Sequence, residues 1–167
     1  MRSDPACRQP ATDFFLDKEG RWFHEGCEIT HARTLRLFSR SLTRDVDGRY
    51  WIEIGAERAR VEVEDTAYQV RSVTVIRTSA GIPFDYVLHL SDGVEELLDP
   101  ATLAVGKRNV LYCSVRNGSE RARFLRQAYY QLCECFECGD EDRSYWVPWR
   151  GQKMTLFGDE DPLVEAK

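Results

Sequence analysis

The segment 20–26 (Gly-Arg-Trp-Phe-His-Glu-Gly) constrains the fold of this chain more than any other part of the sequence. A glycine at each end marks a tight turn, and the residues between them suit a β-strand. The preceding segment 13–17 (Asp-Phe-Phe-Leu-Asp) is a second strand candidate, so the two segments predict a hairpin. Residues 31–43 then carry an apolar stripe at spacings of three and four, which is typical of an amphipathic helix. The chain therefore begins with a predicted hairpin and helix, with Thr30 as the helix cap.

The rest of the chain predicts further strands and one further helix. Segments that alternate between apolar and polar residues, separated by Gly, Asp and Pro, predict strands at 49–54, 60–65, 69–77, 84–90 and 110–115, and a last hairpin at 144–149 and 152–157. Residues 120–136 carry a second helical stripe, and Gly139 is positioned to end that helix. Residues 91–107 lack a clear period and predict an irregular segment. The fold class expected from this pattern is α+β.

The order of these elements indicates two related halves. In each half a strand leads to a glycine and a helix, and then to an acidic turn. The dipeptide Tyr-Trp opens the hairpin after each predicted helix, at 50–51 and at 145–146. We therefore expect two small related domains, each an antiparallel sheet with a helix. The predicted parts are a disordered lead-in at 1–12, an N-terminal domain at 13–68, a C-terminal domain at 69–158 and a polar tail at 159–167.

Composition excludes several classes of function. The 167 residues carry a net charge of -5, which disfavours binding to duplex nucleic acid, because such binding needs a dense basic surface. No run of about 18 apolar residues is present, so we expect no membrane span. The first 12 residues lack the apolar core of a signal peptide, and a cytoplasmic location is expected. The six cysteines should then be reduced or bound to metal.

Several motifs resemble the bacterial domain-of-unknown-function 1285 family. The most specific is the segment 20–26 followed by Ile29 and a helix with Leu35, Leu37 and Phe38. Two further matches are Asp-Gly-Arg-Tyr at 47–50 and Val-Glu-Asp-Thr-Ala-Tyr at 63–68. A second block of the family resembles Tyr112, Val115, Arg116, Gly118 and the helix through 129–130. The resemblance extends over about residues 13–157.

The resemblance implies a two-domain α+β fold with a duplicated core, whose second domain is similar to pleckstrin-homology-like folds. It also implies a site for a nucleotide-like small molecule at the domain interface and a role in signalling, with no established activity. The chain departs from the family pattern at 66–68, where Thr-Ala-Tyr replaces Ala-Pro-Phe, and at 149–151, where Trp-Arg-Gly replaces a terminal Ser-Gly-Gly-like turn. The cluster Cys133, Cys135 and Cys138 is a further addition.

Trp22 and His24 are the first candidate site residues. On a strand their side chains share one face, whereas Glu25 points to the other face. An indole and an imidazole on one face suit a planar ring, which they would bind by stacking and by a hydrogen bond. The alternative is that Trp22 packs in the core and His24 caps a turn. A catalytic pair of His24 and Glu25 is not expected, because the two side chains diverge.

Asp65 and Arg116 are the second pair of candidates. Asp65 closes a strand at the junction of the two halves, where it would orient an arginine or a ligand hydroxyl; the alternative is a solvated turn. Arg116 precedes the helix expected from about residue 119, and a helix N-terminus favours anions. Arg116 would then complete a phosphate or carboxylate clamp. The alternative is a plain capped turn, because no glycine-rich phosphate loop is present.

The spacing of Cys133, Cys135 and Cys138 resembles a metal knuckle. On a continuous helix the three thiols do not converge, and a tetrahedral zinc site needs a fourth ligand that the neighbouring sequence lacks. Redox sensitivity of the Cys135 and Cys138 pair is a second alternative. We favour free thiols, and we expect no metal and no cofactor.

These observations favour a ligand-binding or regulatory protein over an enzyme. The expected partner is a small anionic or nucleotide-like ligand between the two domains, contacted by Trp22, His24, Asp65 and Arg116, in a signalling role. The rivals are a hydrolase-type enzyme that uses His24 with a carboxylate, and a protein-interaction module. The enzyme lacks a recognisable nucleophile or metal triad. A homodimer is a further option that the sequence leaves open.

Overall fold

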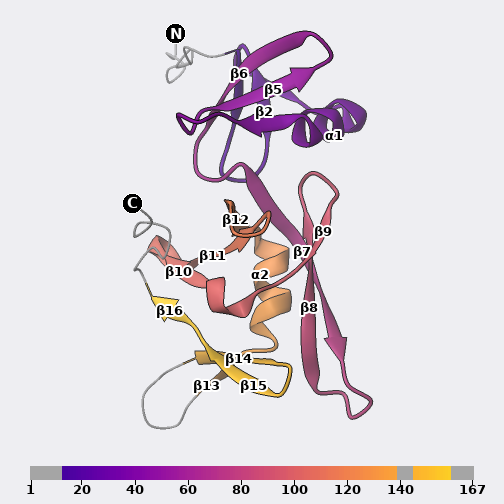
Figure 1. Ribbon diagram of the computed structural model, residues 1–167, viewed down its shortest axis with the longest axis vertical. Coiled ribbons are helices and arrows are strands. Elements are labelled where there is room, and N and C mark those ends of the chain that lie inside the picture. Colours follow the sequence, from indigo (N-terminus) through magenta and orange to yellow (C-terminus); the bar gives the residue numbers. More distant parts are fainter. Residues whose placement is uncertain (1–12, 139–144, 159–167) are drawn as a thin grey trace, which may run out of the picture. The chain divides into compact units, whose positions relative to one another are not determined.

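The computed structural model describes residues 13–138 and 145–158. The chain divides into two compact units, Met1–Ala67 and Tyr68–Lys167, and each is described by itself. The sequence placed the boundary between residues 68 and 69. The predicted lead-in at 1–12, the tail at 159–167 and Gly139 lie outside the described residues. Each unit is built around its own antiparallel-rich sheet with helices, which gives the α+β class (Figure 1).

The N-terminal unit is a six-stranded sheet with one helix. Its elements are β1 (Phe14–Leu16), β2 (Trp22–His24), β3 (Cys27–Ile29), α1 (Ala32–Arg40), β4 (Leu42–Arg44), β5 (Tyr50–Ile54) and β6 (Glu57–Val63). The strand order is β3-β2-β1-β6-β5-β4. The central pair, β1 and β6, is parallel, and the other neighbours are antiparallel. The predicted hairpin and helix are confirmed, whereas the short strands β3 and β4 were not expected.

Two hairpins of this unit share the motif Asp-x-x-Gly-Arg, at 17–21 and at 45–49. In each, the aspartate Oδ1 accepts hydrogen bonds from the backbone N–H groups two and four residues later, at 3.0 and 2.8 Å. The glycine has φ of 79° in both, a left-handed conformation that glycine adopts without steric cost. The motif therefore satisfies the turn backbone and fixes the register of both hairpins.

The core of the N-terminal unit lies between one sheet face and α1. Leu16, Trp22 and Ile52 project from the sheet and are at most 3% exposed. Phe38 of α1 packs edge-on against the ring of Trp22, with 5.6 Å between ring centroids. The helix is capped by His31, not by the expected Thr30: the His31 side chain accepts from the backbone N–H of Thr34. Burial of these rings is the main stabilisation that holds α1 on the sheet.

The C-terminal unit contains a larger sheet and a separate hairpin sheet. Its elements are β7 (Tyr68–Arg77), β8 (Pro83–Leu90), β9 (Glu95–Leu97), the 3₁₀ turns η1 (Pro100–Thr102) and η2 (Lys107–Asn109), β10 (Ala104–Gly106), β11 (Val110–Val115), β12 (Glu120–Phe124), α2 (Arg126–Cys133), β13 (Glu137–Cys138), β14 (Tyr145–Trp149), β15 (Gln152–Thr155) and β16 (Phe157–Gly158). The larger sheet has the order β16-β10-β11-β12-β7-β8-β9, and the smaller one is β13-β14-β15. The expected irregular segment 91–107 thus contains two short strands.

The predicted long helix over 120–136 is wrong in its first part. Residues 120–124 form β12, which pairs with β11 and, in parallel, with β7. Ala122 and Phe124 alternate into the core, so the segment also fits a strand period. The helix α2 begins only after Leu125, and it contacts β7 through Gln131, whose Oε1 accepts from the backbone N–H of Val73 at 2.8 Å.

The two units repeat one strand topology. Read from β9, the C-terminal sheet runs β9-β8-β7-β12-β11-β10, which matches β3-β2-β1-β6-β5-β4 strand for strand. In both, the first and last of the six strands pair in parallel at the centre. The duplicated core is therefore present, but the two Tyr-Trp dipeptides do not mark equivalent places, because one lies in β5 and the other in β14. The helices also differ: α1 precedes the fourth strand, whereas α2 follows the sixth.

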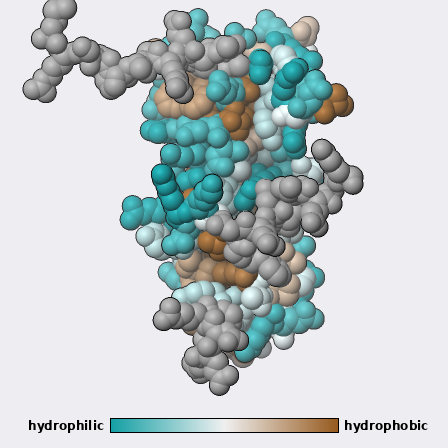
Figure 2. All heavy atoms as spheres, turned by 90° about the vertical axis from the view of Figure 1, so that its left-hand side faces the viewer, coloured by the Kyte–Doolittle hydropathy of each residue, from teal (hydrophilic) through white to brown (hydrophobic). Residues whose placement is uncertain are grey.

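Hydrophobic side chains reach the surface in limited patches. On the face shown in Figure 2, such patches occur in each unit and are bordered by polar side chains. In the described part of the chain, neither helix has the length and apolar character that crossing a membrane would require.

Candidate functional site

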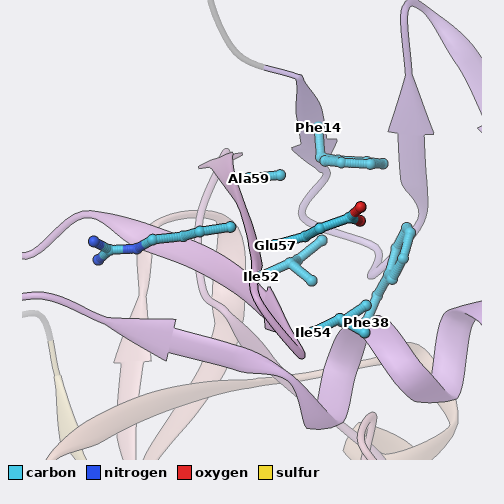
Figure 3. A pocket seen from close by; sticks show the side chains of 7 residues that line it. Phe14, Phe38, Ile52, Ile54, Glu57 and Ala59 are labelled. Atoms are coloured by element: carbon cyan, nitrogen blue, oxygen red, sulfur yellow. The ribbon is translucent and has the colours of Figure 1, made fainter.

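A pocket of about 510 Å³ opens in the N-terminal unit between the sheet and α1. Seven residues from β1, α1, β5 and β6 line it: Phe14, Phe38, Ile52, Ile54, Glu57, Arg58 and Ala59. Five of these seven are apolar, so the walls suit a hydrophobic or aromatic group. Figure 3 shows the pocket from close by.

Strand register explains how these residues meet. Ile52 pairs with Ala59 and Ile54 pairs with Glu57, so all four side chains project from the same face of β5 and β6. Phe14 begins β1, and its ring meets Phe38 of α1 edge-to-face, with 5.0 Å between centroids. The two rings form the aromatic side of the pocket, and the two isoleucines form its apolar floor (Figure 3).

Glu57 supplies the negative charge of the pocket. Its carboxylate extends toward the space between Phe14 and Phe38 (Figure 3). No residue in the described parts of the chain forms a hydrogen bond or an ion pair with it. An ionised carboxylate only accepts hydrogen bonds, so Glu57 offers its full acceptor capacity to whatever enters.

Arg58 is engaged on the opposite side of the strand. Its guanidinium carbon lies 4.1 Å from the centroid of the Trp51 ring, and its Nε lies 3.1 Å from Glu53 Oε1. Trp51 and Glu53 alternate with the pocket residues of β5 and so belong to the other sheet face. The positive charge of Arg58 is therefore held away from the Glu57 carboxylate.

Trp22 and His24 share the face on which the pocket opens, as the alternation predicts. His24 is exposed, and its ring stacks on Phe14 with 4.8 Å between centroids and an interplanar angle of 30°. Trp22 is only 3% exposed beneath Phe38. This burial shows that Trp22 packs in the core, which was the alternative given above. A ligand would reach its indole only after Phe38 moved. Glu25 lies in the following turn, with φ of 49°.

Arg116 lies in the C-terminal unit and has two acidic partners. Its guanidinium forms ion pairs with Asp92 and with Glu96, the latter at 3.6 Å, and its backbone N–H donates to Glu96 Oε2 at 2.9 Å. The guanidinium carbon also lies 5.0 Å from the centroid of the Tyr68 ring. Asp92 is 2% exposed, so this pairing is largely shielded from solvent. The two carboxylates neutralise the charge that we expected an anionic ligand to use.

The prediction that a helix begins beside Arg116 is wrong. Residues 116–119 form the turn between β11 and β12, and Arg116 and Asn117 both have φ of 55°. Because no helix starts there, no helix dipole faces Arg116. Asp65 lies in a bend after β6, is exposed and has interactions with other residues. Of the four predicted site residues, the structure places His24 and Trp22 against pocket walls, His24 exposed on Phe14 and Trp22 buried beneath Phe38.

The cysteines are thiols in separate surroundings. Cys133 ends α2, Cys135 is buried after it, and Cys138 is exposed in β13. Burial raises the pKa of the Cys133 and Cys135 thiols, which keeps them protonated near neutral pH. Within 13–138 and 145–158, no group of three or more His, Cys, Asp or Glu side chains is arranged to hold a metal ion.

The sequence-based prediction missed Glu57 and Ala59. Its strand began at residue 60, whereas β6 begins at Glu57. Every second residue of the predicted strand 49–54, at 50, 52 and 54, pairs with residues 61, 59 and 57 of β6, and the alternation of side chains across the turn was the available signal.

Comparisons with known proteins agree with this architecture. Two crystal structures are similar at 20% identity: a DUF1285 family protein from Silicibacter pomeroyi DSS-3, with a TM-score of 0.67 over 87% of this chain and 79% of that one, and a DUF1285 family protein from Shewanella baltica OS155, with a TM-score of 0.55 over 74% and 92%. At this identity the likeness concerns the fold. No curated protein matches the chain.

The model of the N-terminal domain of the domain of unknown function DUF1285 matches residues 5–66. The matched stretch includes the segment 20–26 and all seven residues of the pocket. It ends one residue before the end of the N-terminal unit. The family resemblance read from the sequence is thereby confirmed, and the N-terminal unit of this chain matches the N-terminal domain of DUF1285.

Proposed function

We propose that this protein is a ligand-binding module and that the pocket of its N-terminal unit receives the ring of a small molecule. The observation that carries the proposal is an open apolar pocket with one carboxylate at its wall that no described residue pairs with. Its volume of about 510 Å³ falls in the range of roughly 300–1,000 Å³ that small-molecule sites occupy.

The walls favour a planar or compact ring over a flexible chain. Phe14 and Phe38 stand at 73° to each other, so a ring that enters can stack on one and meet the edge of the other. His24 stacks behind Phe14 and supports its orientation. A nucleotide-like ligand fits this proposal if its ring enters and its anionic group stays in solvent, because Glu57 repels an anion inside.

We further propose that ligand binding by this protein serves a regulatory role in signalling. Support for binding rather than catalysis comes from the site itself. His24 stacks on a phenyl ring, and its neighbour Glu25 lies in the turn that follows β2. A hydrolase-type centre would need His24 within hydrogen-bond reach of a carboxylate, about 2.6–3.2 Å. No such bond to His24 exists among the residues that the structure describes.

Filling the pocket tests the proposal. Ala59→Trp places an indole where the ring would lie, whereas Ala56→Trp adds the same indole to the exposed turn between β5 and β6. A ligand present at about 100 times its Kd stabilises a protein by about 2.7 kcal/mol. We expect a panel of nucleotides and other small ring compounds to raise the melting temperature of the wild type and of Ala56→Trp, and not of Ala59→Trp.

Two results would count against it. If no compound in the panel stabilises the wild type at millimolar concentration, the pocket is not a binding site for this class. If Ala59→Trp responds as strongly as Ala56→Trp, binding occurs elsewhere. Both variants should keep the far-ultraviolet circular dichroism of the wild type, which shows that the sheet remains folded.

The ligand-binding role that the sequence predicts for Arg116 has its own test. Arg116→Ala removes the cation that pairs with the buried Asp92 carboxylate, so this variant should lose about 3–5 kcal/mol of stability with or without a ligand. If Arg116 also holds the anionic group of a ligand, the ligand-induced rise in melting temperature should disappear as well. An unchanged rise would remove Arg116 from the ligand-binding residues and leave it as part of the C-terminal unit alone.

A further inference from the structure

The pocket has a chemical selectivity that follows from Glu57. We infer that the ring which enters carries a cation or a pair of adjacent N–H donors on its inserted edge. This inference rests on the proposed function, because it names the class of ligand for the same pocket. The inference applies only to the edge of the ring that enters the pocket, and the rest of the ligand can have any charge.

The carboxylate is the first support. Glu57 extends toward the space between Phe14 and Phe38, and no described residue pairs with it (Figure 3). Its two oxygens are acceptors in one plane, which match two parallel N–H donors such as those of an amidinium or a guanidinium. A ring that presents only acceptors would leave these oxygens facing lone pairs, and a carboxylate ligand would meet a like charge.

The aromatic wall is the second support. The face of a phenyl ring is electronegative, and a cation within about 6 Å of its centre is attracted to it. Phe14 and Phe38 stand at 73° to one another, so a cation beside Glu57 lies near two rings of different orientation. The two rings and the carboxylate therefore all favour a cation at this position.

The position of Arg58 is the third support. It is the single basic residue among the seven that line the pocket. As the next residue on the strand it points away from Glu57, and its guanidinium contacts Trp51 and Glu53 on the other face of the sheet. The acceptor capacity of Glu57 is thus left to a ligand.

Three probes of one shape separate the effect of charge from that of fit. Benzamidine, benzamide and benzoate each join one phenyl ring to a planar group, which is respectively cationic, neutral and anionic at pH 7. Each is a single ring with a small head group and is much smaller than the pocket volume of about 510 Å³. Titration followed by ¹H–¹⁵N spectra of the full chain reports both the affinity and the location of binding.

The expected order of affinity is benzamidine, then benzamide, then benzoate, with shifts at Phe14, Ile52 and Ala59. Glu57→Gln keeps the shape and removes the charge, and it should weaken benzamidine about tenfold, as the loss of a charge-assisted hydrogen bond does. The matched control is Glu62→Gln, which removes an exposed carboxylate from the other face of the same strand and should leave benzamidine binding unchanged. Added salt should weaken benzamidine binding in the wild type, because Glu57 is exposed.

The outcomes distinguish this inference from the proposal beneath it. If all three probes bind equally, or if Glu57→Gln does not alter benzamidine binding, the selectivity is overturned. The pocket then remains a site for a ring. Absence of benzamidine binding at the solubility limit also overturns it. Binding that persists in Ala59→Trp overturns the pocket itself as the site.

Discussion

Asp85 shows how a single buried carboxylate joins two sheets of the C-terminal unit. It lies on β8 and is 5% exposed. Its Oδ2 accepts from Arg150 Nη2 at 2.8 Å, and its Oδ1 accepts from the backbone N–H of Tyr86 at 3.0 Å and from Trp149 Nε1 at 3.2 Å. Burial acts to raise the pKa of this carboxyl, but the hydrogen bonds from Arg150, Tyr86 and Trp149 outweigh it and hold the pKa below its usual value.

Asp85→Asn should therefore destabilise the protein by about 1–3 kcal/mol in urea denaturation at pH 7. A carboxyl with a lowered pKa in the folded state stabilises fully above its unfolded pKa of about 3.9, and this stabilisation is lost as the pH falls through the folded value. The difference from the wild type should accordingly shrink as the pH falls below about 4. The control Asp47→Asn breaks an exposed pair with Arg49 and should change stability by at most about 0.5 kcal/mol. A difference for Asp85→Asn that is independent of pH would refute this assignment.

At the scale of elements, the shared Asp-x-x-Gly-Arg turn is the clearest link between sequence and structure. The same five-residue pattern produces the same hydrogen bonds and the same glycine φ in two separate hairpins. The requirement is local, so it can be read from the sequence without knowledge of the fold.

Gly48 offers a test of this turn. An added Cβ would lie 3.4 Å from the flexible Arg44 side chain, so space is tight but adaptable, and the φ of 79° is the main obstacle. We expect Gly48→Ala to cost about 1 kcal/mol and Gly48→Asn to cost less, because asparagine tolerates the left-handed region. Chemical denaturation of both variants measures this difference. Equal losses would show that contact with Arg44, and not backbone conformation, sets the cost.

Other elements could not be assigned from local sequence. The strand β11 at 110–115 is predicted residue for residue, because its alternation is unambiguous. Residues 120–124 satisfy both a strand period and the start of a helical stripe. Their pairing with β7, more than 50 residues earlier in the chain, selects the strand. The pocket was missed for a similar reason, since Phe14, Phe38 and Glu57 meet only when α1 packs on a sheet whose register brings β1 beside β6.

At the scale of the whole molecule, the two units share six strands in one order but differ in what is added to them. The N-terminal sheet is covered by α1 on the face that holds the pocket. The C-terminal sheet carries α2, the extra strand β16 and the hairpin sheet that Asp85 fastens. Duplication was predicted from the order of elements, whereas the correspondence of strands required the pairing of distant segments.

The parallel pair at the centre of each sheet has a consequence for how such a protein arises. Because β1 and β6 run in the same direction, the polypeptide enters a unit at one end of the central pair and leaves at the other. Only four residues, 64–67, separate the end of β6 from the start of β7. A gene copied head to tail could therefore yield two foldable copies without a new connecting loop, and each copy would be free to acquire its own additions by later mutation.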